Sequence, residues 1–372
     1  IAFESETGLY SLKLSDGSPQ KLDIKVSEDY HFYDVERKRF TDNVSSFAIS
    51  PNKKLMAFTI RGELFVKKND KDHRRSVQLT DHPYRDRQVA FLNDTTLIFT
   101  SDRHGQYDIF KLTSSDESRS NIYKSLKHQI TRLTNTPESE ENLHLSPDRE
   151  KIAYQRGRGE LVVRSITENQ NLGSETILLD GWAEPEDISW SPGGQWVAYA
   201  KADLDFNVEV YIQKWDGSMD PVNVSKHPRP DTEPVWSPDG TKLAFLSSRN
   251  NRDEDVWFVW LREEDWQRTQ LEWEERDSVG TKADTAVEKP IEIDFENLYE
   301  RMQQVTSLPG NESDIAISED GETFYFVTNR DGWRNYNAEM DLHKIQWDGS
   351  KLRRLTEGGE SPRNVHFGPG YK

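Results

Sequence analysis

The 372-residue sequence contains no cysteine. Disulfide bonds, thiol nucleophiles and zinc sites built from thiolates are therefore excluded, and cysteine usage leaves the redox compartment open. No apolar run is long enough to cross a bilayer, and no secretory signal opens the chain. We expect a soluble domain without membrane insertion, and we favour a periplasmic location slightly over a cytoplasmic one.

The sequence also lacks the motifs that mark common enzyme sites. It has no Gly-x-Ser-x-Gly nucleophile elbow, no His-Glu-x-x-His, no phosphate-binding glycine-rich loop and no Rossmann fingerprint. Asp203, Asp205 and Asn207 alternate like the start of a calcium loop, but the glycine and glutamate that should follow are missing, so we interpret them as a polar hairpin turn. We expect no catalytic residue, no metal site and no cofactor in this chain.

The sequence contains fewer basic than acidic residues. The 48 Lys and Arg residues face 66 Asp and Glu residues, which gives a formal net charge of −18 at pH 7. Such a surface repels phosphate groups, so nucleic acid and anionic membranes are excluded as bulk partners.

What the sequence does contain is a repeat. Residues 233–260 hold a short apolar strand, a tight turn at Ser237–Gly240, a second strand, a polar turn and a third strand rich in Val, Phe and Trp. In the tight turn Pro238 fixes φ and Gly240 can adopt the left-handed conformation. Related stretches surround Ser50-Pro51, Leu92–Asp94, Ser146–Asp148, Ser191–Gly194 and Ser318–Gly321. A period of roughly 45 residues with several strands per unit is typical of propeller blades.

The repeats predict an all-β fold, a seven-bladed β-propeller with four-stranded antiparallel blades. Six units start at Phe47, Val89, Leu143, Ile188, Val235 and Ile315. The seventh combines the two ends of the chain: residues 364–372 would supply the innermost strand and its turn, and Ile1–Phe3 and Leu9–Leu14 the next two strands. We therefore expect one domain over residues 1–372, with the N- and C-terminal segments sharing one blade, which removes exposed sheet edges.

One partly helical insert, Arg262–Leu298, interrupts the sixth unit. Glu263–Arg276 has helix-forming composition, with Trp266, Leu271 and Trp273 near one face. Ile291–Phe295 should return as an extended segment to an outer strand at Arg301–Thr306. The insert is either a surface decoration or a docking or gating element.

The units resemble PD40 or TolB-like propeller repeats, in which a Ser-Pro-Asp-Gly turn is followed by a Ser-Asp-Arg-x-Gly turn. Here these are Ser237–Gly240 and Ser101–Gly105, and Trp-Asp-Gly turns occur at Trp215–Gly217 and Trp347–Gly349. Residues 293–326, with the acidic insert before them, are similar to the seven-bladed propeller of tricorn-type proteases, large serine peptidases that trim oligopeptides.

The resemblance implies a domain that guides or filters oligopeptides through its channel, next to PDZ and catalytic domains of a longer chain. The catalytic Ser and His of that family belong to domains without a counterpart here, so no catalytic residue is carried over. The sequence starts at Ile1, inside a blade and without Met. We expect a piece of a longer polypeptide, with a homo-oligomer as a further possibility.

Basic residues from several repeats should gather on one propeller face. There, the turns between second and third strands meet the connections that enter each innermost strand. Guanidinium groups near a channel mouth suit carboxylates, either peptide C-termini or acidic side chains. The candidate substrate-binding residues are Arg85, Arg87, Arg103, His104, His227, Arg229, Arg249 and Arg330, with His82, Arg252 and Arg334 on the same face.

Two interpretations of these residues stay open. Arg103, Arg249 and Arg330 follow the repeat, so each could instead pair with a neighbouring Asp and hold blades together. Arg85, Arg87 and Arg229 lie on entering loops and are better placed to bind a ligand.

Three functions follow from the sequence. The chain is a non-catalytic propeller domain of a tricorn-like serine peptidase, a free-standing TolB-like scaffold that docks partner proteins, or an enzyme complete in itself. If the chain is a peptidase domain, its ligands are oligopeptides. If it is a scaffold, the insert is the surface most suited to contact a partner protein.

Overall fold

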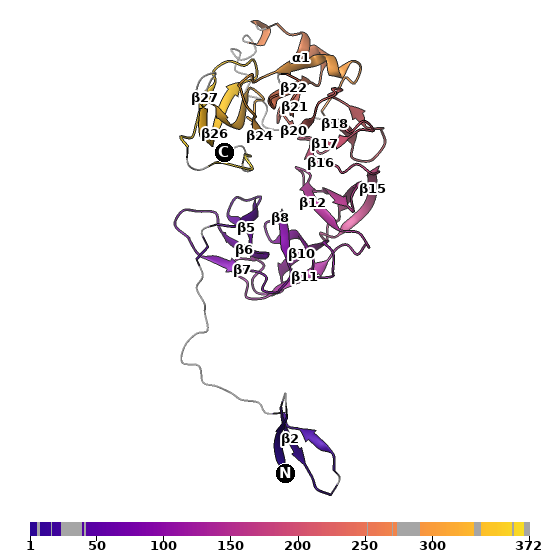
Figure 1. The fold of residues 1–372 in the computed structure, drawn as a ribbon, viewed down its shortest axis with the longest axis vertical. Coiled ribbons are helices and arrows are strands. Elements are labelled where there is room, and N and C mark those ends of the chain that lie inside the picture. The colour runs from indigo at the N-terminus through magenta and orange to yellow at the C-terminus, as the bar shows by residue number, and fades with distance from the viewer. Residues whose placement is uncertain are drawn as a thin grey trace. The chain divides into compact units, whose positions relative to one another are not determined.

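The computed structural model describes residues 1–5, 8–15, 17–23, 39–40, 42–250, 252–269, 271–273, 291–330, 336–358 and 361–367. The chain forms two compact units, Ile1–Asp42 and Asn43–Lys372, which are described here each by itself (Figure 1). Among the described residues, no helix is both long and apolar enough to span a bilayer.

The structure is nearly all β and contains seven antiparallel sheets, as predicted for a seven-bladed propeller. The N-terminal unit is a three-stranded sheet of β1 (Ala2–Ser5), β2 (Gly8–Leu12) and β3 (Pro19–Lys21). The other six sheets have four strands each, hydrogen-bonded in chain order. They are β4 (Val44–Ile49), β5 (Leu55–Ile60), β6 (Glu63–Lys68) and β7 (Ser76–Gln78); β8 (Asp86–Asn93), β9 (Thr96–Ser101), β10 (Asp108–Ser114) and β11 (His128–Arg132); β12 (Glu140–Leu145), β13 (Lys151–Arg156), β14 (Glu160–Ile166) and β15 (Leu172–Asp180); β16 (Glu186–Trp190), β17 (Trp196–Ala202), β18 (Val208–Lys214) and β19 (Val222–Asn223); β20 (Asp231–Trp236), β21 (Lys242–Ser247), β22 (Asp255–Trp260) and β23 (Met302–Gln304); and β24 (Ser313–Ile317), β25 (Thr323–Arg330), β26 (Tyr336–Gln346) and β27 (Arg353–Arg354).

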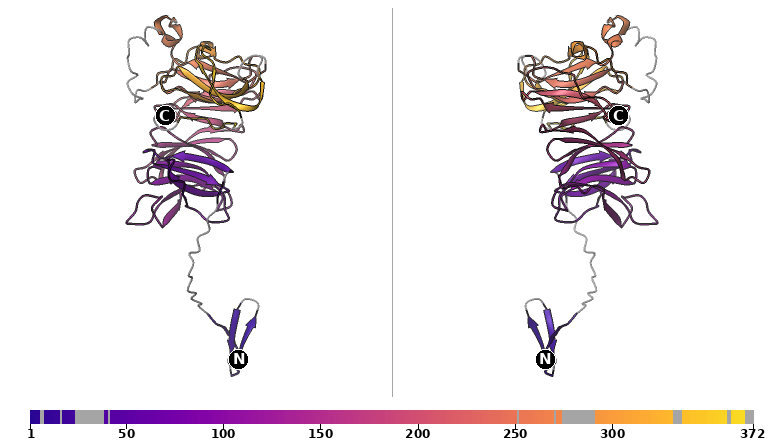
Figure 2. Two further views of the ribbon diagram at one scale, coloured as in Figure 1. Left: turned by 90° about the vertical axis from the view of Figure 1, so that its left-hand side faces the viewer. Right: turned by 90° about the vertical axis from the view of Figure 1, so that its right-hand side faces the viewer.

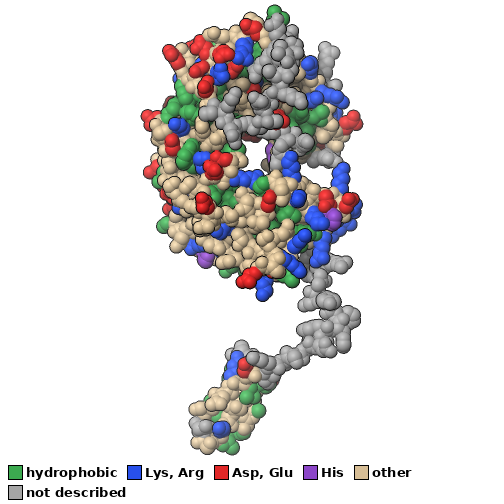
Figure 3. Space-filling model, turned by 180° about the vertical axis from the view of Figure 1, so that it is seen from behind, with side chains coloured by type: hydrophobic (Ala, Val, Ile, Leu, Met, Phe, Trp, Pro, Cys, Tyr) green, Lys and Arg blue, Asp and Glu red, His purple; other side chains and the backbone are tan. Residues whose placement is uncertain are grey.

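The six four-stranded sheets are arranged around a common centre (Figure 1). The first strands of successive sheets contact one another, β4 with β8, β8 with β12, and so on to β24. They are therefore the innermost strands. The side views in Figure 2 show the same sheets edge-on, and an opening is visible near the middle of the ring in Figure 3.

The repeated turn has a chemical reason for its serine. The Ser237 hydroxyl accepts a hydrogen bond from the Lys242 amide at 2.8 Å and thereby closes the hairpin between β20 and β21. The turns that begin at Ser50, Ser146, Ser191 and Ser318 repeat this bond at 2.9–3.0 Å. A second repeated bond ties the fourth strand to the third, where the amide of Leu64, Ile109, Val210, Val256 or Leu342 donates to the hydroxyl of Thr80, Thr134, Ser225, Thr306 or Thr356.

The C-terminal segment lies between the last sheet and the first. The Asn364 amide donates to Asp314 Oδ1 on β24. The His366 ring stacks on Phe47 of β4, with centroids 5.2 Å apart. The segment thus lies beside the innermost strands of the last and first sheets, where the sequence predicted the innermost strand of a seventh blade, but its residues 364–367 form no strand. The N-terminal sheet has three strands, which is the number that this blade lacks. That the N-terminal sheet pairs with the C-terminal segment to form one blade stays a prediction.

The insert is only partly as predicted. A short helix α1 (Glu263–Gln267) begins it, and a 3₁₀ turn η1 (Leu298–Arg301) ends it before β23. Residue 270 and residues 274–276 of the predicted helix lie outside the described residues. Ile291–Phe295 returns without strand pairing, and its apolar side chains pack against the core around Leu298. The expectation that three apolar side chains share one face was wrong, because Trp273 is buried while Trp266 and Leu271 are exposed.

Trp273 fastens the insert to the propeller by closing an aromatic cage around a buried lysine. Its ring stacks on Trp260, with centroids 5.2 Å apart. The fully buried Lys242 ammonium lies 4.5 Å from the Trp260 ring centroid and 5.8 Å from that of Trp273. It donates hydrogen bonds to Thr241 Oγ1 and to the Gly321 carbonyl. A buried cation is tolerated only with such partners.

We expect Trp273→Ala to lower the free energy of unfolding by about 3–5 kcal/mol, because it opens a cavity and uncovers the buried ammonium. Urea denaturation followed by circular dichroism measures this loss. Trp266→Ala is the matched control, since Trp266 is exposed in the same insert, and should change stability by less than about 0.5 kcal/mol. Equal effects of the two substitutions would contradict the anchoring role.

Candidate functional site

The predicted basic residues lie at one end of the sheets. In an antiparallel four-stranded meander, the connection into the first strand and the turn between the second and third strands meet at the same end. We call this end the entry face. The predicted residues that the structure describes fall into two groups on it, one around β8–β11 and one around β20–β25. Arg334 lies outside the described residues.

Two of the predicted arginines are built into the blades. Arg103 Nη2 lies 3.0 Å from Asp86 Oδ1, and the guanidinium carbon lies 4.6 Å from the Phe110 ring centroid. Arg249 repeats this arrangement, with Nη2 3.0 Å from Asp231 Oδ2 and the Trp257 ring 5.0 Å away. Each also donates through Nε to a serine hydroxyl, Ser101 or Ser247. These contacts match the interpretation that the repeat encodes both side chains.

Other predicted residues are more accessible. Arg85 is exposed on the connection into β8. Arg87 is exposed too, but the prediction that it lies on the entering loop was wrong, because it belongs to β8 and pairs with Thr100 of β9. Its guanidinium lies 5.0 Å from the Tyr107 ring centroid. His104 is exposed and stacks on Phe110. These three residues lie close to Arg103 along the entry end of one blade. In the second group, His227 and Arg229 are half-buried beside Arg249, Arg252 is exposed, and Arg330 on β25 lies beside Gly310.

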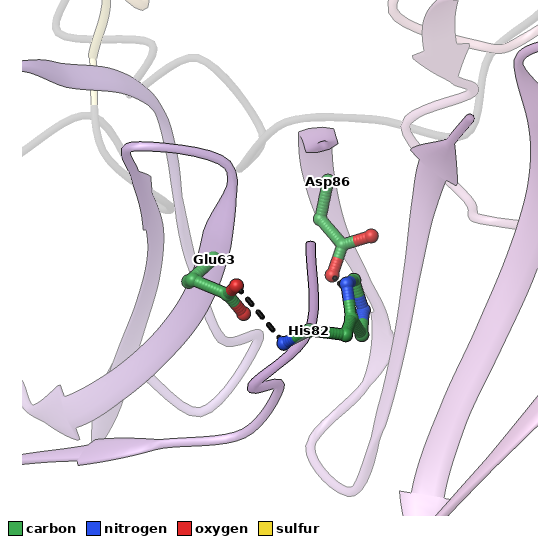
Figure 4. A group of neighbouring side chains, drawn as sticks. All are labelled: Glu63, His82 and Asp86. Carbon is green, nitrogen blue, oxygen red and sulfur yellow. Dashed lines mark hydrogen bonds and ion pairs between the residues drawn. The ribbon is translucent and has the colours of Figure 1, made fainter. Parts of the chain in front are cut away.

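Glu63, His82 and Asp86 gather between the first two blades, with one ligand-type atom from each within 4.8 Å of the others (Figure 4). The His82 amide donates to Glu63 Oε1 at 3.1 Å, and His82 Nε2 lies 3.3 Å from Asp86 Oδ2. Arg103 Nη2 lies 2.9 Å from the same His82 nitrogen. The guanidinium therefore already supplies the positive charge, and a metal cation would be repelled by it.

A second copy of the Glu-His-Asp arrangement supports the interpretation that the group has a structural role and does not bind a metal. At the junction of β18 and β20, the His227 amide donates to Glu209 Oε1 at 2.9 Å, and Asp231 pairs with Arg249. Both copies come from a His-Pro-x-x-Asp sequence, His82–Asp86 and His227–Asp231. The arrangement occurs twice in equivalent places, so it belongs to the joining of blades. The repeated motif was visible in the sequence but was not recognised as a junction.

The innermost strands carry a feature that the sequence reasoning missed. Each has an irregular register with β5, β9, β13, β17, β21 or β25. In five of these strands a non-glycine residue adopts a left-handed φ of 50–57° at that place, and Asn364 does so at 54° in the C-terminal segment. The five are Gln88, Asn142, Asp187, Glu233 and Asp314. Non-glycine residues rarely adopt this conformation without a local reason.

The local reason is a chain of hydrogen bonds around the centre of the ring. The Asn142 amide donates to Gln88 Oε1 at 2.9 Å. The Glu233 amide donates to Asp187 Oδ2, and the Asp314 amide to Glu233 Oε2, both at 3.0 Å. The side chain of one bulge residue thus accepts from the backbone of the next blade. Asparagine and aspartate at these positions would have been the available signal, because both tolerate left-handed backbone.

The chain of bulge residues is acidic on one side of the ring. Asp187, Glu233 and Asp314 follow one another from β16 to β24, whereas Gln88 and Asn142 on β8 and β12 are amides. Burial raises the pKa of Glu233 to about 7, and the nearby carboxylates of Asp187, Asp314 and Glu254 contribute to this increase.

The fold has counterparts among solved structures. The crystal structure of the tricorn protease superposes with a TM-score of 0.59 at 13% identity, over 93% of this chain and 33% of that chain. A Mycobacterium tuberculosis puromycin-hydrolyzing peptidase gives 0.54 at 10% identity, over 81% of this chain and 42% of that one. TolB from Acinetobacter baumannii gives 0.46 at 12% identity, over 85% and 69%.

The similarities to the tricorn protease and to the peptidase support the propeller fold. The chain spans about a third of the tricorn protease chain. No protein-family model matches the sequence. No curated protein matches it either.

Proposed function

We propose that this chain is a non-catalytic propeller domain of a tricorn-like serine peptidase, and that it guides or filters oligopeptides through its channel. The observation that carries the proposal is the pair of exposed guanidinium groups of Arg85, on the connection into β8, and Arg87, at the start of β8. The acidic series of bulge residues lies on β16, β20 and β24 of the same ring. A free peptide has a carboxylate at one end and an ammonium at the other, so both kinds of charge at the entry suit it. The similarity of fold to the tricorn protease is consistent with this role.

Binding should be weak, because a channel that retains its cargo cannot release it. We expect an oligopeptide with a free C-terminal carboxylate to bind about tenfold more tightly than its C-terminal amide, since a charge-assisted hydrogen bond is lost. Isothermal titration calorimetry on the 372-residue chain measures both affinities. The double variant Arg85→Ala/Arg87→Ala should remove the preference.

The control is Arg74→Ala/Arg75→Ala, because these two arginines are equally exposed but lie on the turn between β6 and β7 at the opposite end. It should keep the preference for the free carboxylate. If no oligopeptide binds the wild-type chain, or if both double variants behave alike, the proposed role of the entry arginines is wrong.

The domain assignment has its own test, the intact mass of the polypeptide in its native source. A mass far above 43.2 kDa would agree with a domain of a larger peptidase. A mass near 43.2 kDa would contradict it and would favour the free-standing scaffold.

The scaffold is the second candidate, and the insert supports it. Trp266 and Leu271 are exposed apolar side chains near α1, and such side chains frequently mark contact surfaces. Under this function, Trp266→Ala/Leu271→Ala should abolish capture of a partner in a pull-down, and unchanged capture would count against it.

A further inference from the structure

A hollow on the entry face is formed where three loops meet. It has a volume of about 280 Å³. Its walls come from four places: the turn between β13 and β14 at Gly159; the end of β15 with the connection that follows it, at 179–183; the end of β17 with the turn that follows it, at 201–204; and Tyr211 on β18. This is close to the lower end of the range of about 300–1,000 Å³ for pockets that hold drug-sized ligands. The hollow therefore suits one amino-acid side chain better than a large cofactor.

The hollow depends on a close backbone approach. A Cβ placed on Gly159 would lie 1.7 Å from the Gly181 carbonyl oxygen. Only glycine permits the two loops to meet at this point. The position of these two walls of the hollow is therefore set by the backbone.

The rim is apolar and open to solvent. Trp182 is 45% exposed, Leu204 85% and Phe206 76%. The Trp182 and Phe206 rings meet edge-on, with centroids 5.3 Å apart. Three large apolar side chains grouped at the mouth of a hollow are unusual on a surface with this much charge, and a contiguous apolar patch commonly marks a binding site.

The charges around the hollow determine what it can hold. Asp180 and Asp203 line it, Glu184 follows on the connection into β16, and Glu186 begins β16. Lys201 is the basic residue among the lining residues, and its ammonium lies 4.6 Å from the Tyr211 ring centroid. The Lys201 ammonium thus already forms a cation–π contact inside this hollow. The surplus of carboxylates leaves it suited to a second cation.

We propose that this hollow binds the basic side chain of a Lys or Arg residue in an oligopeptide, with the apolar stem of that side chain on Trp182 and Phe206 and its charge toward Asp180. The inference rests on the proposed function, because it supplies the peptide. It predicts that the entry face prefers oligopeptides that contain a Lys or Arg residue. The Arg85 and Arg87 group would hold the carboxylate end, and the hollow would hold a basic residue upstream of it. The same cationic chemistry could come from a free N-terminus, so the test separates the two sources.

The test compares matched octapeptides by isothermal titration calorimetry on the 372-residue chain. All have a free C-terminus. One has an acetylated N-terminus and a single lysine, a second replaces that lysine by norleucine, and a third is the norleucine peptide with a free N-terminus. We expect the lysine peptide to bind about five- to tenfold more tightly than the acetylated norleucine peptide. Equal binding by the lysine peptide and the free norleucine peptide would assign the site to any organic ammonium group.

Variants connect the preference to the hollow. Trp182→Ala and Asp180→Asn should each bring the ratio of the two affinities close to one, and Lys201→Met should increase it by removing a competing charge. Trp266→Ala is the matched control, because Trp266 is also 45% exposed but lies in the insert, and it should leave the ratio unchanged. Circular dichroism verifies that each variant is folded.

The outcomes separate the two proposals. If the acetylated peptides bind with equal affinity, or if Trp182→Ala keeps the lysine preference, the inference about the hollow is wrong while peptide binding stands. If no octapeptide binds, both the proposed function and this inference are overturned.

Discussion

Asp86→Ala should lower the free energy of unfolding by about 3–5 kcal/mol, one of the largest effects expected for a single substitution in this chain. The Asp86 side chain is fully buried, and it neutralises Arg103, whose side chain is only 14% exposed. His82 lies against the same carboxylate. Removing the carboxylate leaves a positive charge in the junction between the first two blades without its partner. Urea denaturation gives the loss.

Two controls accompany this measurement. Asp81→Ala removes an exposed carboxylate from the same connection and should cost less than about 0.5 kcal/mol. Asp231→Ala removes the equivalent carboxylate beside Arg249 and should cost as much as Asp86→Ala. The double variant Asp86→Leu/Arg103→Met should regain most of the loss, because it removes both charges. A loss below about 1 kcal/mol for Asp86→Ala would show that the pair does not hold the junction.

The second large effect concerns pH. Asp255 at the start of β22 and Glu312 before β24 form a buried pair of carboxyl groups, with Thr306 Oγ1 donating to Glu312 and Gln304 Nε2 to Asp255. Burial raises the pKa of both groups, and the neighbouring Asp255 carboxylate raises the pKa of Glu312 further. A raised carboxyl pKa in the folded state means that the folded protein holds a proton that the unfolded chain releases. Stability should therefore fall as pH rises above the ordinary glutamate value.

Glu312→Gln should abolish most of this fall, because the amide has the shape of the protonated acid and cannot ionise. Between about pH 5 and pH 8, the wild-type chain should lose more than about 1 kcal/mol relative to the variant. Urea denaturation at several pH values measures the difference. Glu319→Gln alters an exposed carboxylate and should leave the pH dependence as it is. Parallel pH profiles for the wild-type chain and Glu312→Gln would show that the pair carries no shared proton.

The propeller was predictable because its turns are local. Ser237, Pro238 and Gly240 determine a hairpin within a few residues, and the same pattern recurs along the chain. The position of the C-terminal segment followed from the repeat, since Asn364 stands where an innermost strand must begin. The helical insert was less predictable, because the burial of Trp273 depends on Trp260 and Lys242, which belong to the sheet.

The candidate site was predictable only in part. The sequence placed Arg85, Arg87 and Arg103 at one end of a blade, but the contact of Arg103 with Asp86 depends on how the connection into β8 folds back. The hollow beside Trp182 depends on three loops from two blades. A repeat pattern aligns equivalent residues, whereas such a site is formed by residues that differ from the repeat.

The chain of bulge residues gives the propeller a direction. At several junctions one blade offers a side-chain acceptor to the blade that follows it, and the following blade donates a backbone amide, as from Asp187 to Glu233 and from Glu233 to Asp314. Because the donor side and the acceptor side of a blade differ, blades joined in this way can follow one another in one direction only. A new blade inserted by duplication would be compatible at both of its neighbours at once, while the loss of half a blade would leave a donor and an acceptor unmatched. Growth and shortening of such a protein during evolution should therefore proceed by whole blades.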